Sequence, residues 1–142
     1  MRHRFAALLL AVTLWGCQPP DTRLNFNLEP QANDVVRVTG DTSLPDGAQL
    51  NVSLLKPGTE EPIVVDLPVV KESRFEARLD PHTDLPAGTY EVLIEFSPKA
   101  FAWSDAVKPA VGENGEKLGG PYVKESAEGF RFLSIARTVR LP

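Results

Sequence analysis

The sequence predicts an all-β protein, a Greek-key-type β-sandwich of about seven strands. Short segments in which apolar and polar residues alternate recur along the chain, the pattern of strands with one buried face. The 142 residues include 13 prolines and 10 glycines, so frequent turns are expected and long helices are not. Because each such strand has one apolar face, a second sheet must cover the first.

Five segments carry this alternation, each with aliphatic or aromatic side chains on one face. They are residues 36–38, 50–54, 75–79, 90–96 and 135–141, the last of them interrupted by Arg137. A sixth run, 63–70, is rich in branched residues, but Pro62 and Pro68 confine it to the edge of a sheet. A long insertion, 97–131, separates the strand that ends at Phe96 from the last strand.

A turn sequence, Leu-Pro-x-Gly, occurs at 44–47 and again at 85–88, and a strand-like segment follows each copy. Proline presets φ at the second turn position, and glycine accepts a positive φ later. The second copy continues as Thr89-Tyr90-Glu91-Val92, which resembles the strand entry of immunoglobulin-like, fibronectin-like and transthyretin-like sandwiches. The resemblance implies that the Tyr90 hydroxyl returns to the backbone, a structural role.

Three longer stretches, 38–47, 85–90 and 111–121, together resemble a group of exported bacterial proteins that have no assigned activity. This resemblance covers most of the chain that follows the N-terminal segment described next. It supports the sandwich fold and implies no particular function.

The N-terminus has the pattern of a secretory signal. Residues 1–4 are positively charged, and the next eleven, 5–15, contain no charged side chain. A membrane-spanning helix needs about 20 apolar residues, so this run is too short to anchor the chain by itself. We therefore expect a signal peptide over 1–16, an N-terminal Pro-rich tether over 17–33, and the sandwich domain over 34–142.

The end of this signal, Leu14-Trp15-Gly16-Cys17, resembles the lipobox of bacterial lipoproteins. The resemblance implies cleavage between Gly16 and Cys17, with diacylglycerol on the Cys17 sulfur and an acyl chain on its amino group. Two or more acyl chains hold a protein stably on a bilayer. The resemblance also implies that Gln18 directs the protein to the periplasmic face of the outer membrane in a Gram-negative cell. The alternative is an ordinary secretory signal with an incidental cysteine.

The predicted tether has three prolines, which favour an extended chain that lifts the domain off the lipid. Within it Leu24, Phe26 and Leu28 alternate with polar residues, so a short strand lying on the domain is a second interpretation.

The insertion 97–131 is longer than most loops in compact domains, and such loops are usually functional or disordered. Ser97-Pro98 predicts a short helix over 98–106, and Asn114-Gly115 predicts a small hairpin over 109–123. Its aromatic residues allow two interpretations. Phe101, Trp103 and Tyr122 could anchor a partner or ligand, or they could pack against the sandwich and hold the insertion in place.

Little in the sequence points to chemistry. His82 is the one histidine that remains after the signal is removed, and Asp80 and Asp84 flank it. This trio precedes a turn, where aspartates commonly cap the backbone, and no second histidine or cysteine is present to complete a zinc site. We predict no metal and no cofactor. A hydrolase that uses His82 and nearby acids is the enzymatic alternative.

The charge balance excludes one class of partner. Removal of Arg2 and Arg4 with the signal leaves 13 basic and 19 acidic residues, a net charge of −6, which argues against nucleic acid. The favoured hypothesis is a non-enzymatic, lipid-anchored module of the cell envelope that binds a protein or glycan. An assembly factor that pairs its edge strand, 63–70, with a partner strand is a further alternative.

Overall fold

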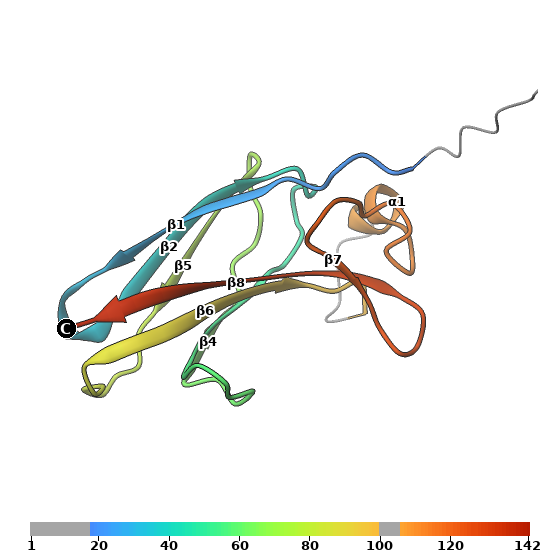
Figure 1. The fold of residues 1–142 in the computed structure, drawn as a ribbon. Coiled ribbons are helices and arrows are strands. Elements are labelled where there is room, and N and C mark those ends of the chain that lie inside the picture. The colour runs from blue at the N-terminus through green and yellow to red at the C-terminus, as the bar shows by residue number, and fades with distance from the viewer. Residues whose placement is uncertain (1–17, 100–105) are drawn as a thin grey trace, which may run out of the picture.

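The computed structural model describes residues 18–99 and 106–142 and confirms the predicted all-β sandwich. Two antiparallel sheets form its two layers (Figure 1). The three-stranded sheet has the order β1-β2-β5, from β1 (Leu24–Pro30), β2 (Val36–Thr42) and β5 (Arg74–Leu79). The five-stranded sheet has the order β4-β3-β6-β8-β7, from β3 (Asn51–Leu55), β4 (Val64–Asp66), β6 (Gly88–Phe96), β7 (Val123–Glu125) and β8 (Arg131–Leu141).

The chain crosses between the sheets in Greek-key fashion. β2 pairs with β5 and β3 pairs with β6, so strands that are neighbours in space are separated along the chain. The apolar faces predicted from the alternation meet between the layers. Alternate side chains of the long central strands are buried there, among them Phe75, Ala77, Leu79, Tyr90, Val92, Ile94 and Phe96. Burial of this apolar surface is the main stabilising contribution.

The turn before β6 forms the corner that the resemblance implied. The Tyr90 hydroxyl donates a hydrogen bond of 2.6 Å to the carbonyl oxygen of Pro86, while its ring is buried in the core. The bond fixes the start of β6 against the turn that leads into it, so Tyr90 has a structural role. In the first copy of the turn, Gly47 takes the positive φ, 92°.

The N-terminal part of the fold starts earlier than the predicted boundary at residue 34. β1 pairs with β2 along its whole length, and Leu24 and Phe26 are buried in the common core. The alternation of Leu24, Phe26 and Leu28 therefore marks a strand of the sandwich, and these residues are not part of a tether. A 3₁₀ turn, η1 (Ala32–Asp34), connects β1 to β2.

The predicted elements of the insertion differ from those observed. The described helix is α1 (Val107–Val111), after the predicted span of 98–106, of which 100–105 lie outside the described residues. The predicted hairpin over 109–123 is wrong: Gly115 belongs to a turn after α1, where its N–H bonds the Gly112 carbonyl. The hairpin is formed by β7 and β8 instead, because Val123 finds its partner in Leu133 of the long strand β8.

Candidate functional site: an apolar sheet edge beside a cationic cleft

The segment from β4 to residue 70 is extended, and one of its two faces is buried while the other is exposed. Its inward side chains, Pro68 and Val70, are buried, Val70 to 1% exposure. Its outward side chains are apolar as well: Val65 is 43% exposed, Leu67 37% and Val69 52%. Within 18–99 and 106–142 these three are the large apolar side chains that remain exposed. They form a stripe along one side of the segment, which we call the apolar edge.

The backbone of the apolar edge also lacks a neighbouring strand on one side. β4 is the first strand of its sheet and pairs with β3. Further along, the Leu50 N–H donates to the Pro68 carbonyl at 2.9 Å, and the Val70 N–H donates to the Ala48 carbonyl at 2.8 Å. Backbone groups of successive strand residues point to opposite sides, so those of Val65, Leu67 and Val69 point to the free side.

One carboxylate closes part of this side. Asp66 accepts hydrogen bonds from the Leu67 N–H at 2.8 Å and from the Arg78 N–H of β5 at 2.9 Å. It thereby links the edge of the five-stranded sheet to the edge of the three-stranded sheet. Val65 and Val69 lie on either side of Asp66 in the chain. Their side chains are exposed, and their outward N–H and C=O groups face no strand of the described chain.

A cleft of about 510 Å³ adjoins Val69 and runs beside β5. Its wall combines apolar Val69 and Phe75 with four charged residues, Arg37, Lys71, Arg74 and Glu76. Three cations against one anion give the cleft a positive balance on a chain whose expected mature charge is −6.

The charges of this cleft are unequally paired. Arg37 donates to Glu76 at 2.8 Å, and this hydrogen bond together with the charge attraction raises the pKa of Arg37 and lowers the pKa of Glu76. Lys71 and Arg74 have no carboxylate within salt-bridge distance in the described part of the chain. Asp41, opposite Arg74 across the strands, pairs with Arg23 at 3.1 Å instead. Lys71 and Arg74 are thus available to an anionic group.

The site residues predicted from sequence fall elsewhere. Cys17, Phe101 and Trp103 lie outside the described residues. Tyr122 is half-buried and packs against the core. For Tyr122 this fits the interpretation in which the aromatic residues hold the insertion in place.

His82 lies on an exposed turn and, with Asp80 and Asp84, lines a cleft of about 280 Å³. Its side chain is 84% exposed, its φ is 55°, and its Nδ1 lies 3.4 Å from Asp80. Asp80 accepts the His82 backbone N–H at 2.9 Å. That bond, followed by a hydrogen bond from Arg78, lowers the pKa of Asp80. The carboxylate therefore acts as a turn cap, and the described residues contain no cluster of three potential metal ligands.

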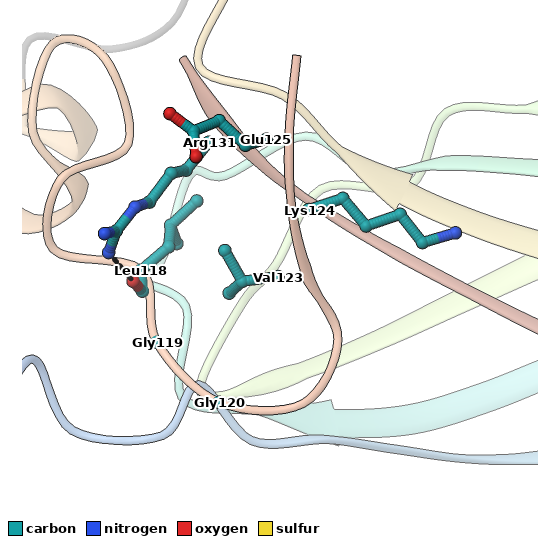
Figure 2. Close-up of a pocket in the computed structure, with 7 residues that line it drawn as sticks. All are labelled: Leu118, Gly119, Gly120, Val123, Lys124, Glu125 and Arg131. Atoms are coloured by element: carbon teal, nitrogen blue, oxygen red, sulfur yellow. Dashed lines mark hydrogen bonds between the residues drawn. The ribbon is translucent and has the colours of Figure 1, made fainter. Parts of the chain in front are cut away.

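A smaller cleft, of about 280 Å³, lies between β7 and the segment 118–120 (Figure 2). Arg131 crosses it and donates to the Leu118 carbonyl at 3.4 Å, while Lys124 extends away from that contact. The cleft separates two parts of the insertion that are held by this contact, and we assign it to the packing of the insertion.

Comparison with known proteins adds no family and no homologous fold. No protein-family model matches the sequence, and no curated protein and no solved structure matches it. Separately, none of the helices within 18–99 and 106–142 has the length and apolarity needed to span a bilayer.

Proposed function

We propose that this protein is a lipid-anchored, non-enzymatic interaction module of the cell envelope, and that it binds an extended segment of a partner protein at the apolar edge. Cys17 provides the anchor, and the sandwich presents the edge. The observation that carries the proposal is the exposure of Val65, Leu67 and Val69 on a strand edge whose outward backbone groups have no strand of the described chain beside them.

Natural proteins seldom leave such an edge open, because it pairs readily with other chains. Charged residues, prolines and bulges usually protect it, yet here the three outward side chains are all apolar. Sheet edges of this kind bind extended peptides by β-augmentation, in which backbone hydrogen bonds hold the peptide and alternate side chains select it. Val65, Leu67 and Val69 are alternate residues, and alternate side chains along an extended strand lie about 7 Å apart, the repeat of a paired peptide.

The charge of the adjoining cleft indicates which chemical groups the bound segment should carry. Lys71 and Arg74 lie in the cleft with Val69 and have no salt-bridge partner among the described residues, so an acidic side chain or a terminal carboxylate of the bound segment would have a partner there. The expected ligand is a protein segment with apolar residues at alternate positions and an acidic group near one end.

Site-specific photo-crosslinking in intact cells tests this proposal. A photoreactive amino acid at Leu67 should yield a discrete adduct, and the same amino acid at Thr138, an exposed strand position on β8, should not. The double variant Val65→Thr, Val69→Thr keeps the branched shape but removes the apolar surface, and it should abolish the adduct. Lys71→Glu with Arg74→Glu should weaken the adduct.

Two results would count against this proposal. Equal adducts at Leu67 and Thr138 would mean that the apolar edge is not a specific site. An adduct at Leu67 that survives the threonine double variant would mean that the apolar side chains do not hold the partner. The anchor has its own test, because the mass of the mature protein should show cleavage before Cys17 and two or three acyl chains.

A further inference from the structure

We infer that the end of the sandwich that carries α1 and Gly119-Gly120 faces the membrane at close range, with the bilayer surface as its partner. The inference rests on the proposed lipid anchor at Cys17. The expected 17-residue tether is replaced by a short lead, the few residues between Cys17 and Thr22, because hydrogen bonds hold the chain to the fold from Thr22 onward.

The fastening is a reciprocal pair of hydrogen bonds between Thr22 and Gly119. The Thr22 N–H donates to the Gly119 carbonyl at 2.9 Å, and the Gly119 N–H donates to the Thr22 hydroxyl at 3.2 Å. Thr22 is only 9% exposed. The next residue is held as well: the Arg23 carbonyl accepts both the Ser43 N–H at 3.0 Å and the Thr42 hydroxyl at 2.7 Å. The chain is therefore fixed from Thr22 onward.

The two glycines extend this contact toward Cys17. A Cβ atom at Gly119 would lie 2.6 Å from the Pro20 carbonyl oxygen and 2.7 Å from the Pro19 carbonyl oxygen. A Cβ at Gly120, whose φ is 94°, would lie 3.2 Å from the Asp21 side chain. Only residues without a side chain allow the two backbones to approach so closely. Pro19, Pro20 and Asp21 thus lie directly on the 119–120 turn.

The remaining length sets the distance to the membrane. From Cys17 to Thr22 an extended chain reaches at most about 18 Å, and from Cys17 to Pro19 about 7 Å. The headgroup layer of one leaflet is itself about 5–8 Å thick. A free tether over 17–33 could have reached roughly 55 Å. Because the lipid fixes Cys17 at the interface, the end of the sandwich beside Pro19 comes within about one headgroup layer of it.

The anchor, and not charge attraction, brings this end to the bilayer. Its exposed charged residues are mixed in sign, and the acidic Asp21, Glu113 and Glu116 lie among the basic Lys99, Lys108, Lys117 and Arg131. Attraction to anionic lipid needs a cluster of basic residues, and this surface has none among its described residues. The C-terminus lies at the opposite end of the sandwich, and β4 lies away from α1 (Figure 1). The apolar edge is therefore left open to a partner in the aqueous phase.

Fluorescence quenching on vesicles tests the orientation. Cys17 is the one cysteine of the sequence and its sulfur would carry lipid, so an added cysteine is a unique labelling site. The lipidated protein, purified from membranes, is labelled at Lys108→Cys on α1 or at Pro142→Cys at the far end. It is then reconstituted into phosphatidylethanolamine–phosphatidylglycerol vesicles that contain a headgroup-labelled quenching lipid. Quenching at position 108 should exceed quenching at position 142 several-fold.

A matched variant tests whether the short link between Cys17 and Thr22 is what holds α1 near the bilayer. Insertion of about ten Gly and Ser residues between Gln18 and Pro19 leaves the Thr22–Gly119 contact intact but lengthens the lead. It should remove most of the difference between positions 108 and 142. Equal quenching at both positions in the native-length protein, or no effect of the insertion, would overturn the inference.

Flotation tests the lipid anchor separately from the orientation of the domain. If the native protein floats with the vesicles and Cys17→Ser does not, the anchor is established, and the quenching result then decides the orientation alone. If the native protein fails to float, both the anchor and the orientation are overturned.

Discussion

The two open sides of the sandwich are closed in different ways. On one side, Arg137 of β8 reaches across to β1, where it donates to the Phe26 carbonyl at 2.8 Å and its guanidinium carbon lies 4.2 Å from the centre of the Phe26 ring. On the other side, Asp66 links the segment after β4 to β5, but apolar Val65 and Val69 stay exposed beside it. We call these the β1–β8 side and the β4–β5 side.

The β1–β8 side has the features of a protected edge. β7 covers only the start of β8, through residues 131–133, so the rest of β8 has no described strand on that side. Arg137 is itself exposed, but it alternates with buried Ile135 and Val139 along β8, and its guanidinium reaches the Phe26 carbonyl of β1. A charged residue directed inward on an edge strand prevents another strand from adding there.

The β4–β5 side has the opposite character, and folding does not require it. Exposed Val65 and Val69 contribute little burial, and polar residues would serve the fold equally well at these positions. The comparison indicates that one side is guarded against association and the other is left open to it.

The largest expected effect contrasts an apolar residue from each side. Phe26→Ala should lower the free energy of unfolding by about 3–5 kcal/mol, because it leaves a cavity and removes the surface on which Arg137 lies. Val65→Ala should change it by less than about 0.5 kcal/mol, because the side chain is already in water. Denaturant unfolding followed by far-ultraviolet circular dichroism measures the free energy of unfolding of both variants.

A comparable loss for the two variants would contradict the comparison, since it would mean that Val65 contributes to the packed core. The Phe26 variant also tests the corrected domain boundary. If residues before 34 were a tether, replacing Phe26 would leave the free energy of unfolding unchanged.

The sequence predicted the sandwich because the fold depends on alternation, which local residues carry. It indicated the contrast between the two sides only in part. Arg137 interrupts an apolar face, but its partner, the Phe26 carbonyl, is distant in the chain and depends on which strands become neighbours. Pro62 and Pro68 predicted an edge strand for the run 63–70, and β4 is indeed the first strand of its sheet. The run is largely apolar on both faces, however, so the sequence did not indicate which face would stay exposed.

The insertion and the N-terminus were harder to predict for a related reason. Asn114-Gly115 is compatible with several turns, and the long strand β8 determines which segment forms the hairpin. Gly119-Gly120 gave no signal as a contact surface, because its partner, 19–22, looked like a tether. Contacts between residues distant in the chain determine both the hairpin and the contact of 19–22, and local sequence preferences do not predict such contacts.

An intermediate effect on the free energy of unfolding is expected from Arg137, the charged residue that protects the β1–β8 side. Arg137→Met should lower the free energy of unfolding by about 1–2 kcal/mol, through loss of the hydrogen bond to Phe26 and of the cation–π contact. It should also increase self-association, measured by sedimentation at increasing concentration, because the charge that protects the edge is gone. Arg137→Lys is the control. Persistent monomers in the Met variant would mean that Arg137 does not guard the edge.

The smallest expected effect is the acid sensitivity of the β4–β5 side. The hydrogen bond and charge of Arg37 lower the pKa of Glu76 in the folded protein. A carboxylate with a lowered folded-state pKa adds stability above its unfolded-state pKa, and that stability is lost as pH falls through the folded value. Between about pH 6 and about pH 3 the Tm of the native protein should therefore fall slightly more than that of Glu76→Gln.

Both partners of this pair are exposed, so the Tm difference should shrink in high salt. The corresponding test on the β1–β8 side should give a constant result. The contacts of Arg137 are the carbonyl oxygen and the ring of Phe26, which do not titrate, so the Tm difference between the native protein and Arg137→Met should not vary with pH. If the Glu76→Gln difference were equally constant, Glu76 would contribute no titratable stability, and the two sides would not differ in their response to acid.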